Sequence, residues 1–491
     1  MYIGHETLLV ISLTFLLLGN IPELKKLSLI SLFVLGFDLL TNFNITSIPQ
    51  ILHFSVDLLG IAVLSFLSQL LNKTSLKVGY IPIAIYMLLS IHPHQHINVS
   101  QAGNQANADT ELELLVQLKT STDIKTWVNN HQDKYDIKYP LFDPKNDETL
   151  LDEFVGINID DQADINQIIE SLESNNGVAY VEVNEVLKLD LPQQETTNQI
   201  NHTQNMNDPD AGKQWAVEKL KYDDLHNLIR EKQQAQNSKQ IVIAILDTGV
   251  EGNHEDLKEN YISYDPFNDK DIRGHGTHCA GIAAAVTGNN IGIASLLPSK
   301  SKVKITSVKV LSSFGFGSQE QVIKGIIEAS DKGASVISLS LGAPSSLERE
   351  LAYEEAVKYA NNSGAIVVTS AGNSNADAVN YSPANTKGII TITAINSNMR
   401  KASFANRVDN IEFGLAAPGK DIYSTFPNNK YSYQSGTSMA TPLVAGLLGL
   451  MKSINPDLTT QEAFQLMKSN AVKKNGMAIV DPYATISAMM R

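Results

Sequence analysis

A serine near the carboxyl end of the chain stands where it could act as a nucleophile. Ser438 lies in the stretch YSYQSGTSMATPLVAGLLGL, after Gly436, which permits a tight turn, and before the apolar run Leu443–Met451, which predicts a buried helix. We expect Pro442 in the first turn of that helix, where its missing N–H leaves no bond unmade. Unpaired N–H groups at a helix start favour a developing negative charge. The same residues also suit a plain helix cap, because Thr437 and Ser438 are common capping types.

Two stretches upstream hold side chains that favour the nucleophile over the cap. Asp247 ends the apolar run IVIAIL and is followed by Thr248 and Gly249, and His275 lies between two glycines in RGHGTHCAG. Taken singly, Asp247 suits a turn and His275 a structural role. An Asp, a His and a Ser in glycine-lined settings, in that order along the chain, indicate nucleophilic catalysis by the serine.

The apolar runs of the sequence predict how these side chains are positioned. From residue 241 onward, continuous apolar runs typical of strands buried on both faces alternate with stretches of helical spacing. The predicted strands are Ile241–Leu246, Val303–Leu311, Val336–Leu341, Ala365–Thr369 and Ile389–Ile395, and the predicted helices are Gln319–Lys332, Leu347–Asn361 and Leu443–Lys452. This alternation implies an α/β fold with a doubly wound, mostly parallel sheet. In such sheets the chemistry gathers beyond the carboxyl ends of the strands, where Asp247 lies.

At these residues the chain resembles a known family. The DTG around Asp247, the HGTHCAG around His275 and the GTSMATP around Ser438 resemble the three signatures of the subtilisin-like serine proteases, the subtilases. The resemblance runs from about Trp215 to the carboxyl terminus. It implies a subtilisin-like fold with a catalytic triad, in which His275 takes the proton of Ser438 and Asp247 orients the imidazole. It also implies that Asn373, in TSAGN, forms the oxyanion hole with the backbone N–H of Ser438.

The resemblance extends to the substrate. Two segments resemble the strand edges between which the family holds a polypeptide: Phe314, Gly315, Phe316 and Gly317 on one side, and Ser340, Leu341 and Gly342 on the other. Such a peptide is bound by main-chain hydrogen bonds and selected through alternate side chains. No acidic residue clearly matches the floor of the first specificity pocket, so we expect a broad or apolar preference. The expected activity is a serine endopeptidase that acts through an acyl-enzyme.

A structural calcium ion is the cofactor that the resemblance implies. Asp256 matches the family's carboxylate ligand, and TGNNIGI matches the loop that supplies the carboxamide of Asn289 and the carbonyls of Ile291 and Ile293. Oxygen ligands suit a hard cation, and a loop that is stable without an ion is the alternative.

Cys279 lies one turn beyond the candidate base and is expected to be buried and inert. Mercurials are expected to inhibit by displacing the imidazole of His275.

The first part of the chain, residues 1–92, is predicted to be a membrane region with three to four transmembrane helices. Its apolar stretches are 7–18, 27–40, 51–71 and 76–91, and the third alone has the roughly 20 residues of a full span. The lysines of this region are Lys25 and Lys26, between the first and second stretches, and Lys73 and Lys77, where the third stretch gives way to the fourth, so the positive-inside rule puts those two loops in the cytoplasm. Everything after the fourth stretch, beginning with a linker at 93–110, is then expected outside the cytoplasm.

A small α+β module, residues 111–190, follows that linker. A strand is predicted over 112–118, a helix over 163–174 and a second strand over 178–187. By resemblance this module is the subtilase propeptide, an inhibitor within the same chain until it is cleaved. Self-cleavage is expected between Leu187 and Met206, in or beside a linker at 191–212, and the catalytic domain covers 213–491. Because the predicted membrane anchor precedes the cut, maturation would leave the protease held by non-covalent contacts and able to leave.

Composition restricts the remaining functional classes. The 52 acidic and 38 basic residues give a net charge of −14, which argues against nucleic acid as a partner, because phosphate binding needs clustered Lys and Arg. The single cysteine excludes an intrachain disulfide.

Two alternatives to an active protease stay open. One is a catalytically silent binding protein with the same fold, and the other is a membrane transporter or sensor that works through the intramembrane carboxylates Asp38 and Asp57, with the protease as its regulator.

Overall fold

The structure is a computed structural model of the chain, and it describes residues 112–146, 149–159, 163–189, 207–232, 240–345 and 350–491. The chain divides into two compact units, Met1–Gln101 and Ala102–Arg491. The predicted membrane region at 1–92, the linker at 93–110 and most of the predicted linker at 191–212 lie outside the described residues. All described residues therefore belong to the second unit.

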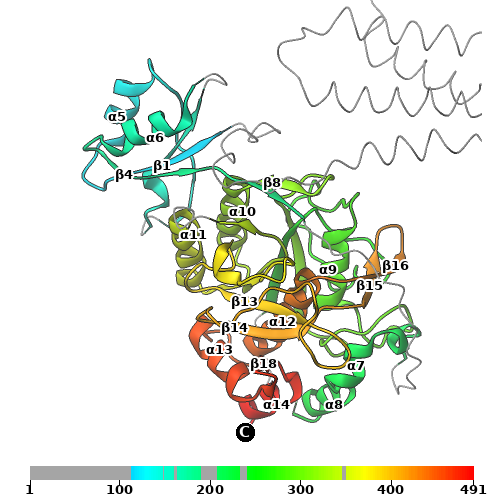
Figure 1. Ribbon diagram of the computed structural model, residues 1–491. Helices are drawn as coiled ribbons and strands as arrows, with labels where there is room; N and C mark the ends of the chain where they lie inside the picture. Colours follow the sequence, from blue (N-terminus) through cyan, green and yellow to red (C-terminus); the bar gives the residue numbers. More distant parts are fainter. Residues whose placement is uncertain (1–111, 147–148, 160–162, 190–206, 233–239, 346–349) are drawn as a thin grey trace, which may run out of the picture. The chain divides into compact units, whose positions relative to one another are not determined.

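Within the described residues, the C-terminal domain is built on an eight-stranded sheet (Figure 1). In spatial order the strands are β17 (Val472–Lys474), β18 (Met477–Ile479), β14 (Gly414–Pro418), β13 (Ile390–Ile395), β11 (Ile366–Ser370), β9 (Val336–Leu339), β6 (Ile241–Asp247) and β7 (Val303–Lys309). Neighbouring strands run parallel except β17 and β18, which are antiparallel. The predicted α/β class with a mostly parallel sheet is confirmed.

Strand β6 shows why this sheet is covered on both faces. All of its side chains are buried; Ile243 and Ile245 belong to one apolar cluster, and Ala244 and Leu246 to the other. Successive side chains of a strand point to opposite faces, so a doubly covered strand must be apolar throughout. The first cluster includes α8 (Tyr222–Lys232), α9 (His275–Ala284), α12 (Thr437–Ile454), α13 (Thr460–Ser469) and α14 (Pro482–Met489), preceded by the short α7 (Trp215–Lys219). The second includes α10 (Gln319–Asp331) and α11 (Glu350–Asn362).

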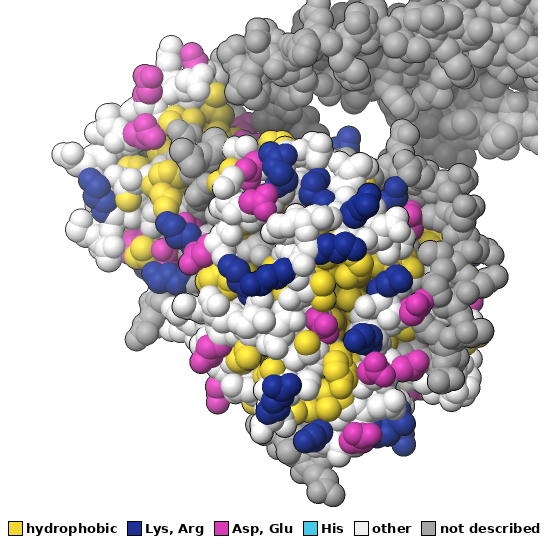
Figure 2. Space-filling model, turned by 60° about the horizontal axis from the view of Figure 1, so that its bottom comes forward, with side chains coloured by type: hydrophobic (Ala, Val, Ile, Leu, Met, Phe, Trp, Pro, Cys, Tyr) yellow, Lys and Arg dark blue, Asp and Glu magenta, His cyan; other side chains and the backbone are white. Residues whose placement is uncertain are grey.

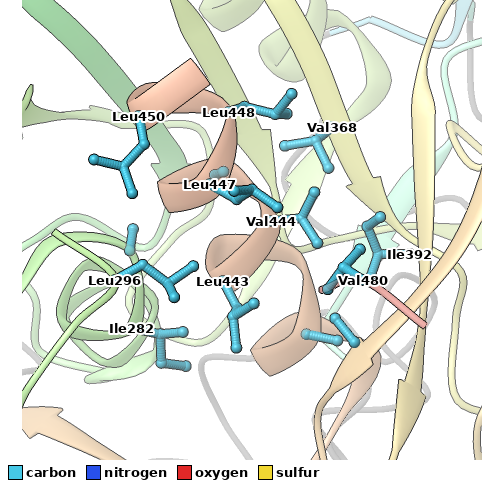
Figure 3. Packing of buried hydrophobic residues seen from close by; sticks show 14 of the residues in the cluster. Ile282, Leu296, Val368, Ile392, Leu443, Val444, Leu447, Leu448, Leu450 and Val480 are labelled. Carbon is cyan, nitrogen blue, oxygen red and sulfur yellow. The ribbon is translucent and has the colours of Figure 1, made fainter. Parts of the chain in front are cut away.

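Helix α12 is the central helix of the first face. It is buried over nearly its whole length, and its leucines and Val444 pack between α9 and the sheet (Figure 3). The labelled contacts are Leu443, Leu447, Leu448 and Leu450 on the helix, Ile282 and Leu296 toward α9, and Val368, Ile392 and Val480 toward the strands. Among the described residues α12 is the one helix with the length and mean hydropathy, 1.2, of a membrane span, yet 94% of that window is buried inside the domain. It is therefore a core helix of this domain.

The start of α12 differs from the sequence-based prediction. The helix begins at Thr437 rather than Leu443, so Pro442 lies inside it and not in its first turn. A proline at that place removes one hydrogen bond of the helix, to the carbonyl four residues earlier. That carbonyl belongs to Ser438 and receives other donors, described below, which explains why the helix continues through the proline.

Several short elements were also missed by the sequence analysis. They are β14, β17, β18, the hairpin of β15 (Ile422–Phe426) and β16 (Lys430–Gln434), and the two-residue strands β10 (Ala343–Pro344) and β12 (Tyr381–Ser382). Strand β14, GLAAP, contains Gly and Pro at its ends and no β-branched residue, so its sequence is typical of a loop. Its partners β13 and β18 make it a strand.

The module before this domain is a four-stranded antiparallel sheet with two helices. Its elements are β1 (Leu114–Leu118), α5 (Ile124–His131), β2 (Asp136–Lys138), β3 (Phe154–Asn158), α6 (Ile165–Glu173) and β4 (Val178–Val183), in the spatial order β2-β3-β1-β4. The carboxylates of Asp123 and Asp164 accept backbone N–H groups at the starts of α5 and α6, as helix caps do. The predicted strand-helix-strand pattern matches β1, α6 and β4, and the sequence analysis missed α5, β2 and β3.

The surface carries charged side chains of both signs. On the face shown in Figure 2, Lys and Arg side chains are interspersed with Asp and Glu and with apolar groups. Among the described residues the most exposed large apolar side chains are Phe267, Ile272 and Phe314. All three lie on loops near the elements that carry the candidate catalytic residues.

Candidate active site

Asp247 and His275 are brought together by the end of β6 and the start of α9. Nδ1 of His275 lies 2.8 Å from both carboxylate oxygens of Asp247, and both side chains are buried. Gly276 allows this approach, because a Cβ there would collide with the carbonyl of Gly249 and contact Asp247. The backbone N–H of Thr248 donates to the same carboxylate at 2.7 Å. This geometry holds the Nδ1 proton of the imidazole toward Asp247.

A second buried carboxylate, Asp271, braces this pair. One of its oxygens accepts the hydroxyl of Thr248 at 2.9 Å and the N–H of Gly274 at 2.8 Å. The other accepts the N–H and the hydroxyl of Thr277, both at 2.8 Å. Asp271 therefore ties the turn after Asp247 to the first turn of α9. The sequence analysis did not single it out, although a carboxylate shortly before a glycine-flanked histidine was a usable signal.

Ser438 lies in the first turn of α12, packed against α9 and the end of β9. Its hydroxyl donates to the carbonyl of Ser340 at 3.1 Å, and its own carbonyl accepts the hydroxyl of Ser340 at 2.9 Å and the thiol of Cys279 at 3.5 Å. That thiol, one ring nitrogen of His275 and one oxygen of Asp247 all lie within 4.8 Å of one another. The aspartate, the histidine and the backbone carbonyl of the serine thus all lie close to the Cys279 thiol. Nε2 of His275 is buried and has no hydrogen-bond partner among the described residues.

The grouping of Asp247, His275 and Cys279 could also suggest a metal site. A thiol binds metals as the thiolate. Burial raises the pKa of the Cys279 thiol well above its ordinary value, and the nearby Asp247 adds to that shift. Without an ion the thiol is therefore protonated, and Nδ1 of His275 already contacts both carboxylate oxygens of Asp247, so hydrogen bonds account for this grouping.

Asn373 lies just past the end of β11, facing the start of α12. Its amide oxygen accepts the N–H and the hydroxyl of Thr437 at 2.9 and 3.0 Å, and that hydroxyl accepts the N–H of Gly372 at 3.1 Å. The oxygen is thus held by the helix start. The amide nitrogen is then the end of the side chain that can donate to a substrate oxygen.

One of the two predicted substrate edges lines a cavity of about 320 Å³, whose lining also includes Ser438 and Asn373. Ser340, Leu341 and Gly342 line one side of it. The cavity is also lined by β5 (Val186–Lys188), the last strand before the undescribed segment at 190–206. Strand β5 pairs in turn with β8 (Phe316–Ser318), which belongs to the second predicted edge. Gly317 lies opposite Leu187, and the carbonyl of Gly315 accepts the N–H of Leu189 at 2.9 Å. Phe314 points to solvent and is 80% exposed.

Buried and exposed side chains alternate along β5 and the residue that follows it, which shows how this edge accommodates a paired strand. Leu187 and Leu189 are buried, and both belong to an apolar cluster of the C-terminal domain that includes Leu341. Lys188 between them is exposed, with its ammonium 5.7 Å from the centre of the Phe316 ring. A strand added to a sheet edge presents alternate side chains to opposite sides.

The predicted calcium ligands lie together, and the structure adds another carboxylate. Asp256 accepts the side-chain amide of Asn289 at 2.8 Å and the N–H of Ile293 at 2.9 Å, and Ile291 donates its N–H to Asn289 at 2.7 Å. The added group is Asp208, just after the undescribed segment, which accepts the N–H of Gly288 at 2.8 Å and that of Asn289 at 3.2 Å. The sequence analysis missed Asp208 because it precedes Asp256 by a long stretch of chain and lies in a polar segment.

The electrostatics of this loop suit a cation. Asp208 and Asp256 are both buried, and neither has a Lys or Arg ion-pair partner within the described part of the chain. The pKa of Asp256 is raised to about 8, chiefly by burial and further by the charge of Asp208, and burial also raises the pKa of Asp208. Two buried carboxylates with a carboxamide and nearby carbonyls form an oxygen donor set of the kind that holds Ca²⁺. The residues present therefore fit the implied ion.

A family model and several known proteins match the part of the chain that carries this site. The family model described as "Subtilase family" matches residues 238–483, a range that contains Asp247, His275, Asn373 and Ser438. Thermitase of Thermoactinomyces vulgaris is 46% identical over 216 residues, which cover 43% of this chain and 74% of thermitase. A thermophilic serine proteinase of Bacillus sp. (strain AK1) is 39% identical over 254 residues, 50% of this chain and 60% of that proteinase. Subtilisin DY of Bacillus licheniformis is 37% identical over 251 residues, 49% of this chain and 88% of the relative.

Proposed function

The chain belongs to the subtilase family and is a serine endopeptidase, and from this premise we propose that Ser438, His275 and Asp247 form its catalytic triad. We further propose that the chain is made as a self-processing zymogen, anchored in a membrane, with its protease domain outside the cytoplasm. The observation that carries the triad is the 2.8 Å contact of His275 Nδ1 with both oxygens of Asp247. The other ring nitrogen, Nε2, is buried and has no hydrogen-bond partner among the described residues.

The proposed reaction uses these groups in sequence. The hydroxyl of Ser438 attacks the carbonyl carbon of the substrate while Nε2 of His275 takes its proton, and the imidazolium then returns that proton to the leaving amine. Water hydrolyses the acyl-enzyme by the same two proton transfers in reverse order. Asp247 keeps the ring in the tautomer that accepts at Nε2. In the described arrangement the Ser438 hydroxyl donates to Ser340, so a rotation about its Cα–Cβ bond is needed to aim it at His275.

The oxyanion that forms in this reaction would be held by Asn373. Its amide oxygen is fixed by Thr437, which supports a fixed direction for the amide nitrogen. The backbone N–H of Ser438 is the second proposed donor. A donor aimed at the developing charge is worth about 3 kcal/mol, a magnitude measured on subtilisin itself.

The zymogen proposal rests on how the module ends. Strand β5 occupies the substrate edge β8, as a bound peptide would. Two N–H groups in the first turn of α10 are also taken by the module: Gln319 donates to the carbonyl of Glu185 and Glu320 to the side chain of Asn184, both at 3.0 Å. First-turn N–H groups have no partner inside their own helix, so this docking satisfies them. We propose that the module is the inhibitory propeptide and that self-cleavage falls between Leu187 and Met206.

The membrane proposal rests on the sequence alone. The apolar stretches and lysine positions in residues 1–92 favour a multi-span anchor with the protease domain outside the cytoplasm. After self-cleavage, non-covalent contacts with the module would be the remaining attachment. Washing membranes of cells that make the mature enzyme should therefore release peptidase activity. Activity that stays on the membrane at high salt would indicate another tether.

Calcium is proposed as a structural ion held by Asp208, Asp256 and Asn289 with the carbonyls of Ile291 and Ile293. When bound, it would supply positive charge to two buried carboxylates. Because Asp208 follows the proposed cleavage segment directly, the ion would fix the start of the mature domain.

The decisive experiment compares the full-length chain with its Ser438→Ala variant. We expect the unmodified chain to yield a fragment that begins after the module and to hydrolyse casein. The variant should stay intact and lose about a millionfold in turnover, by analogy with the same change in subtilisin. A Ser435→Ala variant is a matched control, because Ser435 lies close by and bonds Asp421 instead. Processing that persists in Ser438→Ala would contradict the proposal.

A further inference from the structure

Ser340 and Ser438 form a reciprocal pair of hydrogen bonds. The hydroxyl of Ser340 donates to the carbonyl of Ser438 at 2.9 Å, and the hydroxyl of Ser438 donates to the carbonyl of Ser340 at 3.1 Å. Both residues are buried. Ser340 directly follows β9, in the middle of the sheet, whereas Ser438 is in the first turn of α12. The pair therefore connects the centre of the sheet with the start of the helix.

The sequence of α12 explains why the carbonyl of Ser438 needs an outside donor. In a regular helix each carbonyl accepts the N–H of the residue four positions later. Four positions after Ser438 is Pro442, which has no N–H. A carbonyl buried without a donor is costly, so another group must supply the hydrogen. The donors present are the hydroxyl of Ser340 and, at 3.5 Å, the thiol of Cys279, which is the weaker donor type.

This replacement bond acts on the residue that carries the reaction. The peptide plane that holds the Ser438 carbonyl also sets the direction of its Cα–Cβ bond, and hence the position of Oγ. Small displacements of a nucleophile lower the rate of reaction strongly, because the reacting atoms must be held close to their reactive distance. A donor fixed to the central strand limits the motion of this first helical turn.

We propose that Ser340 is a positioning residue for the nucleophile, and that its hydroxyl replaces the helix N–H that Pro442 cannot provide. This inference rests on the proposed function in one respect, that Ser438 is the nucleophile. It assigns to the Ser340 side chain a role separate from the contact of its backbone with a substrate. The role exists only because of the proline, so the two residues are energetically coupled.

The test measures the effect of Ser340→Ala in two backgrounds, with Pro442 and with Pro442→Ala. Alanine at 442 restores the N–H that the helix lacks. In full-length enzyme, assayed with a quenched fluorescent peptide that copies residues 185–206, we expect Ser340→Ala to lower kcat about tenfold with Pro442 present and to leave KM within about twofold. With alanine at 442 the same change should lower kcat less than about threefold, because the carbonyl now has a partner in its own helix.

Ser338→Ala provides the matched control. Ser338 lies two residues earlier and is equally buried, but its hydroxyl has no hydrogen-bond partner among the described residues. Removing it deletes the same atom from the same strand without breaking a hydrogen bond, so it should leave kcat within twofold and, unlike Ser340→Ala, should not lower the melting temperature.

Three results would overturn the proposal: an equal loss of kcat in both backgrounds, a loss confined to KM, or an equal loss of kcat from Ser338→Ala. A failure of the proposed function gives a different result, because Ser438→Ala would then retain activity. The comparison between the two backgrounds is therefore independent of that outcome.

Discussion

The calcium proposal predicts an unusual dependence of stability on pH. Without the ion, the charge of Asp256 is disfavoured by burial and by Asp208, and its pKa is raised from 3.8 to about 8. Because the pKa of Asp256 is raised in the folded state, the contribution of this group to stability is fully present below pH 3.8 and is lost as the pH rises toward 8. The metal-free domain should therefore become less stable as the solution becomes more alkaline. A bound cation would keep Asp256 ionised and remove this loss.

The size of the effect follows from the shift. One pKa unit corresponds to about 1.4 kcal/mol, so raising the pH from 4 to 7 should lower the free energy of unfolding by at most about 4 kcal/mol through Asp256. For a domain of this size that is a fall in melting temperature of about 10 °C. Burial lowers the pKa of His226 and His254. Through these two groups the folded state loses stability as the pH falls through their ordinary pKa of 6.5, which is the opposite direction from Asp256. The difference between calcium and EDTA isolates Asp256 from them.

The assay is thermal unfolding of the full-length Ser438→Ala chain, which cannot digest itself, from pH 5 to 8 in calcium or in EDTA. We expect the difference in melting temperature between the two conditions to grow with pH. An Asp256→Asn variant should lose both the response to calcium and the EDTA-specific decline. A calcium effect that is constant or shrinks with rising pH would refute the reasoning, as would an Asp256→Asn variant that still responds to calcium.

Three further predictions concern the active site. Replacing Asp271 by Asn weakens the bonds that join the loop after Asp247 to α9, so we expect kcat to fall about 10- to 100-fold, and a change below twofold would contradict the bracing role. Phe316→Ala removes the ring beside Lys188, so the preference for Lys over Met at the matching substrate position should fall about two- to fivefold, whereas an equal loss with both peptides would exclude a contact with the cation. Cys279→Ser should abolish inhibition by mercurials while keeping most of the activity, and inhibition that is unchanged in the variant would show that the reagent acts elsewhere.

The parts of the fold that could be predicted from the sequence are those with a strong local signal. β6, β9 and β13 are continuous apolar runs, and their predicted bounds agree with the structure to within two residues. Runs of this kind arise because both faces of the sheet are covered. The edge elements β17 and β18 have no such requirement, since their side chains are largely exposed or half-buried, and their sequences carry little information about strand formation.

The site was predictable to the extent that its residues lie in short glycine-containing motifs. Asp208 and the Ser340 hydroxyl were not, because their roles depend on contacts between distant parts of the chain. Asp208 contributes through N–H groups of Gly288 and Asn289, 80 and 81 residues away, and Ser340 through a carbonyl 98 residues away. Pro442 misled the prediction for a related reason. Its usual place in the first turn is set by local hydrogen bonding, and here a residue outside the helix provides the missing donor.

The first turn of α12 explains how the proposed nucleophile and a proposed oxyanion donor can belong to one residue. Of its first three N–H groups, that of Thr437 goes to Asn373 and that of Met439 to the carbonyl of Gly436, while among the described residues that of Ser438 has no partner. A first-turn N–H has no acceptor within its own helix, so it can bind an oxyanion without breaking any existing bond. The side chain of Ser438 starts from the same residue, so the proposed attack by Oγ would place the developing oxyanion beside that N–H. Moving the serine one position either way would put it next to an N–H that is already engaged.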